Sequence, residues 1–144
     1  MKIAIGSDHR GFPLKEGLKK YLSDKKIEFA DSGTNSADSV DYPDYAKKVC
    51  EAVVNGGCDF GVLVCGSGIG VSMSANRFRG IRAVNATNNN MAEMSRRHNN
   101  ANVICFGSDF VDLEHAERYL DIFLNTDFEG GERHERRIKK MDTN

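Results

Sequence analysis

The sequence predicts an α/β protein, a three-layer, Rossmann-like αβα sandwich with a five-stranded parallel sheet and a C-terminal helix. Short apolar runs such as residues 60–65 alternate with segments whose apolar residues recur at helical spacing, such as Leu14, Leu18 and Leu22. Regular alternation of strand and helix is typical of a parallel sheet with helices on both faces. We find no repeat or linker that divides the chain, so residues 1–144 are expected to form a single domain.

The elements follow one another in a simple order. Strands are expected at residues 2–6, 27–31, 60–65, 81–84 and 103–106, with helices around 14–22, 45–53, 70–76, 91–97 and 116–123. Pro13 suits the first turn of the first helix. A polar loop over residues 32–43 precedes the second helix. A charged helix over residues 133–141 follows Gly130 and Gly131.

Composition excludes several classes of partner. The chain has 20 basic and 21 acidic residues and a net charge of −1, which argues against a general nucleic-acid or membrane-surface binder. Its longest apolar run is about one strand long, well short of the roughly 20 residues that a membrane helix needs. The first residues are themselves strand-like, so we expect no signal peptide and a cytoplasmic protein.

The four cysteines are Cys50, Cys58, Cys65 and Cys105, and none forms a C-x-x-C pair. We expect no disulfide, and we expect all but Cys65 to be small buried hydrophobic residues. No cluster has metal-ligand spacing, and the only patterns similar to H-x-E lie in the charged tail, where a solvated helix is expected. The sequence therefore predicts no metal.

Cys65 differs from the other cysteines in its sequence context. The segment Cys-Gly-Ser-Gly-Ile-Gly over residues 65–70 places a thiol at the end of a buried strand, directly before a glycine-rich turn and a helix start. Such a turn directs free backbone N–H groups and a positive helix end at whatever lies beside the sulfur. The thiol is a candidate base or nucleophile, and the N–H groups are candidates for binding an anionic oxygen. The spacing does not match a dinucleotide fingerprint.

Three further clusters are candidates for chemistry. Asp8 and His9 follow the first strand, where they suit hydroxyl or phosphate contacts. His98 lies in a polar segment over residues 95–102, just before the last strand, and we expect it on the ligand side of the sheet as an acid–base group. Arg133 and Arg137 lie four residues apart on the tail helix and share one face, so they are candidates for a phosphate clamp.

Taken together, these segments resemble the ribose-5-phosphate isomerase B family, which also includes galactose-6-phosphate isomerase subunits. The match extends over nearly the whole chain, through residues 6–9, 33–34, 41–46, 65–70, 74–77, 80–83, 95–102 and 128–131 and the arginines after them. The resemblance implies an aldose–ketose isomerase acting on a five-carbon sugar phosphate, without a cofactor. It also implies a homodimer, alone or as a dimer of dimers, with active sites at the subunit interface.

The resemblance also implies roles for individual residues. Cys65 is expected to move the proton between C1 and C2, and His98 to open the furanose ring. The residues expected to bind substrate are Asp8, His9, Tyr42, Gly66, Ser67, Gly68, Ile69, Gly70, Asn99, Arg133 and Arg137.

The sequence departs from the family pattern at three positions. Ser67 stands where many members carry Thr, which preserves a hydroxyl. Asp109 stands where many members carry a phosphate-facing Arg, so that contact is absent or supplied elsewhere. Glu132 is an extra residue before Arg133, and it leaves Arg136 as an alternative to either tail arginine.

The sequence leaves three alternatives open. An isomerase of a six-carbon sugar phosphate, such as allose or galactose 6-phosphate, would use the same catalytic groups with a different pocket, which residues 85–90 could shape. A flavodoxin-like nucleotide- or flavin-binding module fits the fold class, and the missing fingerprint and the missing tryptophan argue against it. A cysteine hydrolase would use Cys65 and His98 as nucleophile and base.

Overall fold

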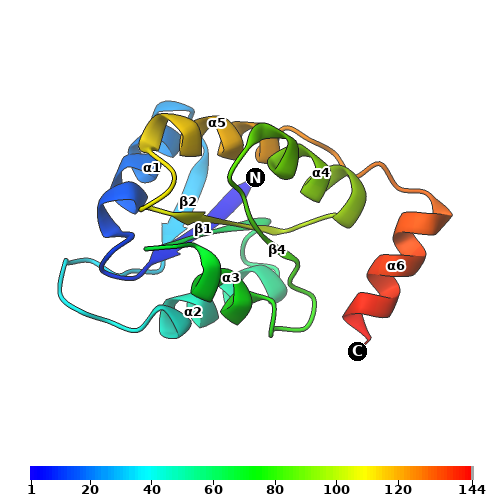
Figure 1. The fold of residues 1–144 in the computed structure, drawn as a ribbon, viewed down its shortest axis with the longest axis horizontal. Helices are drawn as coiled ribbons and strands as arrows, with labels where there is room; N and C mark the ends of the chain where they lie inside the picture. Colours follow the sequence, from blue (N-terminus) through cyan, green and yellow to red (C-terminus); the bar gives the residue numbers. More distant parts are fainter. Residues whose placement is uncertain (144) are drawn as a thin grey trace.

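The computed structural model describes residues 1–143 and contains the expected parallel sheet between two layers of helices (Figure 1). The strands are β1 (Lys2–Ser7), β2 (Glu28–Asp31), β3 (Phe60–Cys65), β4 (Ala83–Asn85) and β5 (Val103–Gly107). They pair in the order β2-β1-β3-β5-β4, and every pair is parallel. The predicted fold class is confirmed. The fourth strand begins two residues later than expected, at Ala83.

The helices lie on both faces of the sheet. On one face are α1 (Phe12–Asp24), α4 (Asn89–Asn99) and α5 (Leu113–Leu124), and on the other are α2 (Tyr42–Val54) and α3 (Ile69–Ala75) (Figure 1). Successive strand residues point to opposite faces. Val62 and Val64 therefore belong to the α1 side of the core, whereas Leu63 and Cys65 belong to the α2 side. The strand pattern directs the Cys65 side chain toward α2 and α3.

The strand order reverses at two places, and this positions the candidate site. From β1 the chain goes outward to β2 and then crosses to β3 on the other side. From β3 it passes over β5 to the edge strand β4 and then returns. The loops that leave β1, β3 and β5 are therefore neighbours at the carboxyl edge of the sheet. Ligands bind at such reversals in open α/β sheets.

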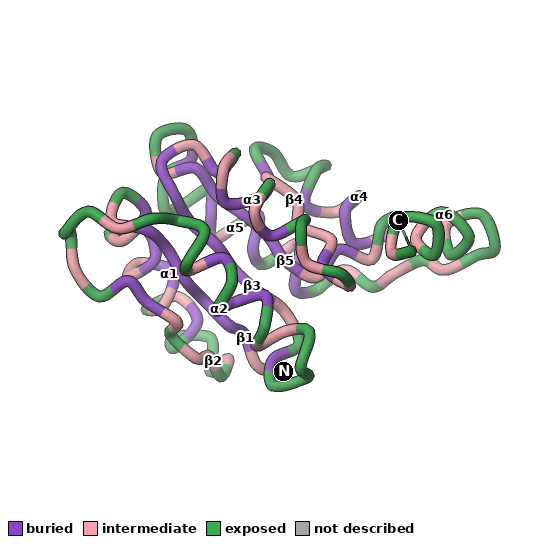
Figure 2. The backbone as a smooth tube through the Cα atoms, turned by 90° about the horizontal axis from the view of Figure 1, so that it is seen from below, coloured by how far each residue is buried: buried purple, intermediate pink, exposed green. Residues whose placement is uncertain are grey.

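The last helix, α6 (Glu132–Asp142), stands apart from the three layers at the end of α4 (Figures 1 and 2). None of its described residues is buried, in contrast to the strands at the centre of Figure 2. Arg82 binds Asp142 at 2.8 Å, and the Arg79 Nε donates to the Asp142 backbone oxygen at 3.0 Å, which ties the end of α6 to the segment before β4. Among residues 1–143, no helix is long and apolar enough to cross a membrane.

A buried ion pair links α1 to β2, and the sequence pattern did not predict it. The Lys15 side chain is fully buried, and its Nζ lies 2.7 Å from the Asp31 carboxylate. Lys19 contacts the same carboxylate at 2.7 Å. Burial by itself raises the pKa of Asp31, but the hydrogen bonds from Lys15 and Lys19 outweigh it and hold the pKa below its ordinary value. Asp31 is therefore ionised in the fold and compensates the charge of Lys15.

We predict that Asp31→Asn lowers the free energy of unfolding at pH 7 by about 2–3 kcal/mol, because it leaves the buried Lys15 ammonium without its counter-charge. Urea denaturation measures this value. Asp24→Asn is the control, since its pair with Lys20 is exposed and its loss is expected to cost less than about 1 kcal/mol. Equal losses in the two variants would contradict the assigned role of Asp31.

The same pair predicts a pH dependence. Because the pKa of Asp31 is lower in the folded state than in the unfolded chain, its contribution is complete above the unfolded value of about 4 and is lost as the pH falls below it. The wild-type protein should therefore lose more stability between neutral pH and about pH 3 than Asp31→Asn does. Denaturation curves at a series of pH values test this, and parallel losses in both proteins would contradict it.

Candidate active site

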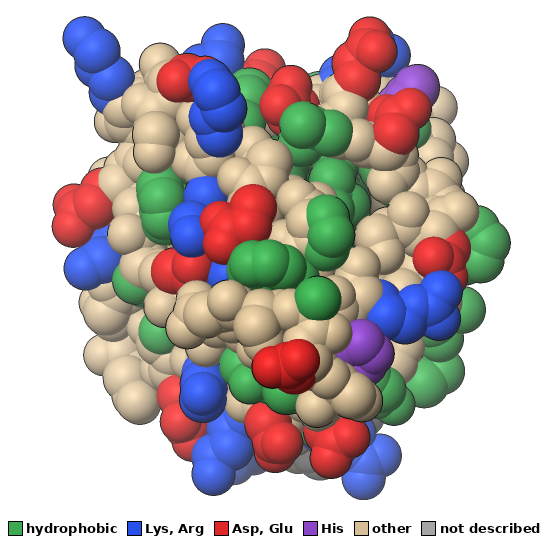
Figure 3. Space-filling model, turned by 90° about the vertical axis from the view of Figure 1, so that its left-hand side faces the viewer, with side chains coloured by type: hydrophobic (Ala, Val, Ile, Leu, Met, Phe, Trp, Pro, Cys, Tyr) green, Lys and Arg blue, Asp and Glu red, His purple; other side chains and the backbone are tan. Residues whose placement is uncertain are grey.

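The loops that follow β1, β3 and β5 are joined by backbone hydrogen bonds at the carboxyl edge of the sheet. The Asp8 N–H donates to the Val64 carbonyl at 3.2 Å, and the Ser108 N–H donates to the Cys65 carbonyl at 2.9 Å. Figure 3 views the molecule from the side toward which β1 points, and acidic and basic side chains are interspersed over this face. The site therefore lies where the strand topology predicts it.

Cys65 ends β3 and is almost completely buried, with 4% of its surface exposed. The Gly68 N–H donates a hydrogen bond to its sulfur at 3.2 Å, which closes the turn between β3 and α3. This bond places a backbone donor on the thiol itself, whereas the glycine-rich sequence predicted N–H groups directed at a ligand beside the sulfur. The other three cysteines are free and buried, as expected. Burial raises the pKa of Cys50 to about 12 and raises the pKa of Cys58 and Cys105, so these thiols stay protonated near neutral pH.

Gly68 is required by both its backbone and its surroundings. Its φ of +75° lies in the left-handed region that glycine adopts without strain. A Cβ at this position would lie 2.4 Å from the Asn85 side-chain oxygen and 2.8 Å from the Gly107 nitrogen. The turn therefore packs directly against the ends of β4 and β5, with no space for a side chain. This close approach holds the backbone N–H groups of the turn in one arrangement.

Several of the predicted binding residues surround this turn. The Ile69 N–H donates to the Ser67 hydroxyl at 3.1 Å, and the Tyr42 ring packs against Gly70, where a Cβ would lie 2.6 Å from the ring. Asp8 is buried, and its carboxylate accepts a hydrogen bond from the Gly11 N–H at 2.9 Å. The structure thus brings Asp8, Tyr42 and residues 65–70 together at one edge.

His9 lies beside Asp8 in the loop after β1, and one hydrogen bond determines which of its ring nitrogens carries the proton. Its Nδ1 accepts from the Val40 N–H at 3.2 Å, so in the neutral ring the proton is on Nε2. His9 is only partly buried. Its Nε2–H is therefore a donor suited to a phosphate or hydroxyl oxygen.

Arg10 is a residue of this site to which the sequence reasoning assigned no role. Its guanidinium covers Gly66 and forms an ion pair with Asp109 across the mouth of the turn. The Ser108 hydroxyl also donates to the Arg10 carbonyl at 3.1 Å. Asp109 therefore does not leave an isolated negative charge beside the candidate anion site, because Arg10 neutralises it. The sequence could have indicated this role, because Arg10 directly follows the candidate residues Asp8 and His9.

The expectation that His98 lies on the ligand side of the sheet is wrong for a single chain. His98 is near the end of α4, which runs back to the amino edge of the sheet, on the right in Figure 1. Asn102, just before β5, accepts a hydrogen bond from Gly61 at the start of β3, whereas Cys65 pairs with Gly107 at the far end of β5. At about 3.3 Å per residue, the two ends of β5 are roughly 13 Å apart. A segment that precedes a strand lies at the edge opposite the ligand site.

His98 instead belongs to a second group of side chains near α6. Its ring stacks on that of His134, with centroids 4.6 Å apart, and its Nε2 lies 3.8 Å from a carboxylate oxygen of Glu129. We call His98, Glu129 and His134 the histidine cluster. Burial, followed by the charges of His98 and Arg133, lowers the pKa of His134. Sequence reasoning did not identify Glu129 and His134, because the contact depends on how α6 packs beside α4.

The tail arginines are close to the histidine cluster in sequence and lie on α6. Arg136, the alternative candidate for a phosphate contact, forms an ion pair with the extra residue Glu132 at 2.6 Å. Its charge is therefore already partnered. Among residues 1–143, neither Arg133 nor Arg137 forms an ion pair. The charges of Arg133 and Arg137 are therefore available to a ligand, and their role as a phosphate clamp stays a prediction.

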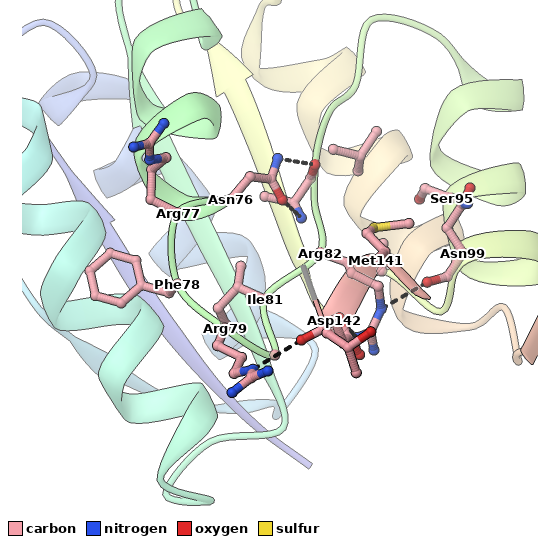
Figure 4. Close-up of a pocket in the computed structure, with 15 residues that line it drawn as sticks. Asn76, Arg77, Phe78, Arg79, Ile81, Arg82, Ser95, Asn99, Met141 and Asp142 are labelled. Atoms are coloured by element: carbon pink, nitrogen blue, oxygen red, sulfur yellow. Dashed lines mark hydrogen bonds and ion pairs between the residues drawn. The ribbon is translucent and has the colours of Figure 1, made fainter. Parts of the chain in front are cut away.

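A groove of about 700 Å³ lies away from Cys65. It lies between the segment before β4, the end of α4 and the end of α6, and Figure 4 shows Arg79 and Arg82 directed at Asp142 there. Asn99 lines this groove, and its backbone carbonyl accepts a hydrogen bond from Arg82 at 2.9 Å. Asn99, like His98, is therefore separated from Cys65 within one chain.

Comparison with known proteins decides the family. A family model described as Ribose/Galactose Isomerase matches residues 3–141. The chain belongs to this family. It is 46% identical over 140 residues to ribose-5-phosphate isomerase B of Escherichia coli (strain K12), covering 97% of this chain and 93% of that protein. The resemblance inferred from the sequence motifs is confirmed.

Solved structures show the same fold. A ribose 5-phosphate isomerase of Thermotoga maritima superposes with a TM-score of 0.97 at 52% identity, covering 99% of this chain and 98% of that chain. Ribose-5-phosphate isomerase B of Clostridium thermocellum also gives 0.97, at 46% identity, with 99% and 96% covered. The three-layer sandwich is therefore the architecture of the family.

We predict that Gly68→Ala is strongly destabilising, because it adds a clash with Asn85 and Gly107 to the strain of a positive φ. Gly56→Ala is the matched control, since Gly56 has a similar φ of +78° and open space around its Cβ position. Urea denaturation should give a loss of about 1 kcal/mol for the control and at least about 2 kcal/mol for Gly68→Ala. Equal losses would show that the close packing of the turn does not contribute.

Proposed function

We propose that this protein is an aldose–ketose isomerase that interconverts ribose 5-phosphate and ribulose 5-phosphate through an enediolate. The observation that carries the proposal is the buried Cys65 thiol, which ends β3 and accepts a hydrogen bond from the glycine-rich turn of the candidate site. The proposal is supported by relatives named ribose-5-phosphate isomerase B that match over nearly the whole chain. Family membership favours an isomerase over a flavodoxin-like module or a cysteine hydrolase.

The chemistry needs a base and a stabiliser of negative oxygen. In the open-chain aldose, the Cys65 thiolate takes the proton from C2, and the electron pair moves to the C1 carbonyl oxygen. The first turn of α3 has backbone N–H groups without intrahelical partners, and these donate to the developing oxyanion. A proton then moves from the C2 hydroxyl to O1, and Cys65 returns its proton to C1 as the C2 carbonyl forms. Donors preorganised at such an oxygen contribute about 3–4 kcal/mol each, so the turn both positions the base and stabilises the intermediate.

The remaining groups of the site are completed by a second copy of the chain. His98, Asn99, Arg133 and Arg137 are at the amino edge of the sheet, away from Cys65 of the same chain. We therefore assign the functional unit as a homodimer, in which these residues of one chain meet the Cys65 turn of the other. Ring opening by His98 and phosphate binding by the two arginines then act on a sugar whose C1 and C2 lie at Cys65.

The exposed surface of α3 supports this assembly. Ile69 and Met73 lie four residues apart on α3, and 50% and 65% of their surfaces are exposed. An apolar pair at this spacing forms one face beside the Cys65 turn. Exposed apolar surface next to a functional site is typical of an interface with another chain. None of the described residues of α6 is buried within its own chain, as expected for a helix that packs on a partner.

Within the Cys65-bearing chain, Asp8, His9 and Tyr42 complete the substrate contacts. Asp8 and the Nε2–H of His9 face hydroxyl or phosphate oxygens, and Tyr42 forms the wall beside Gly70. The proton transfers require no redox cofactor. A cytoplasmic location is part of the proposal and agrees with four free cysteines, since disulfides are rare in reducing compartments.

We predict that the protein turns over ribose 5-phosphate in a coupled ribulose-5-phosphate assay with chelator present, and that Cys65→Ala lowers turnover by more than about 10²-fold. Cys58→Ala removes another buried thiol outside the site and should retain nearly full activity. Near-normal activity of Cys65→Ala would contradict the role of the thiol. Allose 6-phosphate is compared in the same assay, and a higher kcat/KM for it would favour the six-carbon alternative.

Mixing two inactive variants tests the shared site. We expect Cys65→Ala and His98→Ala homodimers each to be strongly impaired. If the two groups act from different chains, unfolding and refolding an equal mixture gives mixed dimers with one intact site, and activity recovers to about a quarter of wild type. If both groups act from the same chain, no intact site forms and activity does not recover.

A further inference from the structure

The histidine cluster brings together three metal-ligating side chains that are distant in the sequence. His98 is near the end of α4, Glu129 is in the loop before α6, and His134 is in the first turns of α6. One ligand atom from each of the three lies within 4.8 Å of the others. The cluster is at the amino edge of the sheet, away from the Cys65 turn of the same chain.

Of these three donor atoms, the two imidazole nitrogens have no hydrogen-bond partner among the described residues. The His134 Nε2 atom is buried and has no partner among the described residues. The His98 Nε2 atom lies 3.8 Å from the nearest Glu129 oxygen, which is longer than a hydrogen bond. Buried polar atoms without a partner are rare in folded proteins, and a bound water or ion is one common explanation for them.

Two imidazole nitrogens and one carboxylate oxygen are the donor set of many three-ligand zinc sites. Zinc forms bonds of about 2.0–2.2 Å to such ligands, so tetrahedral donors lie roughly 3.3 Å apart. The longest separation in the cluster, up to 4.8 Å, must therefore shorten by as much as about 1.5 Å. The His98 and His134 rings are stacked with only 10° between their planes, so one ring must rotate out of the stack before both nitrogens can face one ion. The His98 and Glu129 side chains are 40% and 45% exposed, which gives them space to rotate.

The surroundings allow this contraction. The Glu129 N–H donates to the Arg97 carbonyl at 3.0 Å, which anchors the loop to α4. The Arg97 guanidinium also contacts the Glu129 carboxylate at 3.0 Å, and it has a second partner in Glu93 at 3.2 Å. Arg97 can therefore keep a counter-charge when Glu129 turns toward an ion.

We propose that His98, Glu129 and His134 form a binding site for Zn²⁺ or a similar divalent transition-metal ion, with a fourth position open to water. The site has a consequence for activity, which rests on the proposed function. An ion bound to the His98 nitrogen occupies the lone pair that ring opening uses. Metal binding therefore inhibits the isomerase reversibly, and the reaction itself does not need the metal.

Binding is tested first, on the full-length protein after dialysis against chelator and then buffer. Calorimetric titration with Zn²⁺ should give one ion per chain. Co²⁺ should give visible absorption bands of nitrogen and oxygen ligation without an intense thiolate-to-cobalt band. His134→Ala and Glu129→Gln should each weaken binding at least about tenfold. His115→Ala is the control, because His115 is an exposed histidine that contacts Asp112 and lies outside the cluster.

The proposal is overturned if the wild type shows no saturable binding, if both cluster variants bind as tightly as the wild type, or if a thiolate band appears. Inhibition is tested separately. Zn²⁺ should inhibit turnover of ribose 5-phosphate, chelator should restore it, and whatever activity His134→Ala and Glu129→Gln retain should be less sensitive. Equal sensitivity would overturn the inhibitory role. Binding without any isomerase activity of the wild type would instead contradict the proposed function and leave the metal site supported.

Discussion

The close packing of the turn after β3 against the end of β5 is the constraint on which the rest of the site depends. Gly68 lies so near Asn85 and Gly107 that a single Cβ would clash. The same turn donates a backbone N–H to the Cys65 sulfur. Because β1 and β5 are the hydrogen-bonded neighbours of β3, their loops meet this turn and bring Asp8, His9 and Arg10 to it. The strand order therefore assembles the candidate substrate-binding residues of one chain.

The same topology separates the second half of the chemistry. Groups that follow strands gather at the carboxyl edge, and groups that precede strands, such as His98, are left at the amino edge. A chain of this fold cannot bring Cys65 and His98 together by local adjustment, because the length of β5 lies between their edges. In the proposed homodimer, two copies related by symmetry would each supply the groups that the other lacks. The exposed α6 and the apolar face of α3 are the surfaces that we expect this dimer to bury.

The sequence predicted the fold well because periodicity reports burial directly. Central strands such as residues 60–65 are apolar throughout, and helices such as the one containing Leu14 and Leu18 have one apolar face. It also predicted the Cys65 turn, whose function depends on residues adjacent in the chain. It failed where contacts join distant segments. Lys15 of α1 was not expected in the core, because its burial depends on Asp31 at the end of β2. The edge on which His98 lies and the convergence of Glu129 with His134 depend likewise on strand order and on how α6 packs.

The most direct test of the account is a crystal structure of the protein with a hydroxamate analogue of the enediolate bound. The account predicts that the planar hydroxamate contacts Cys65 and the backbone of residues 66–70 of one chain. His98 of a second chain would reach the same molecule, and Arg133 and Arg137 of that chain would bind its phosphate. An analogue bound at Cys65 with no residue of a second chain in contact would contradict the shared site. An analogue bound away from Cys65 would contradict the role of the turn itself.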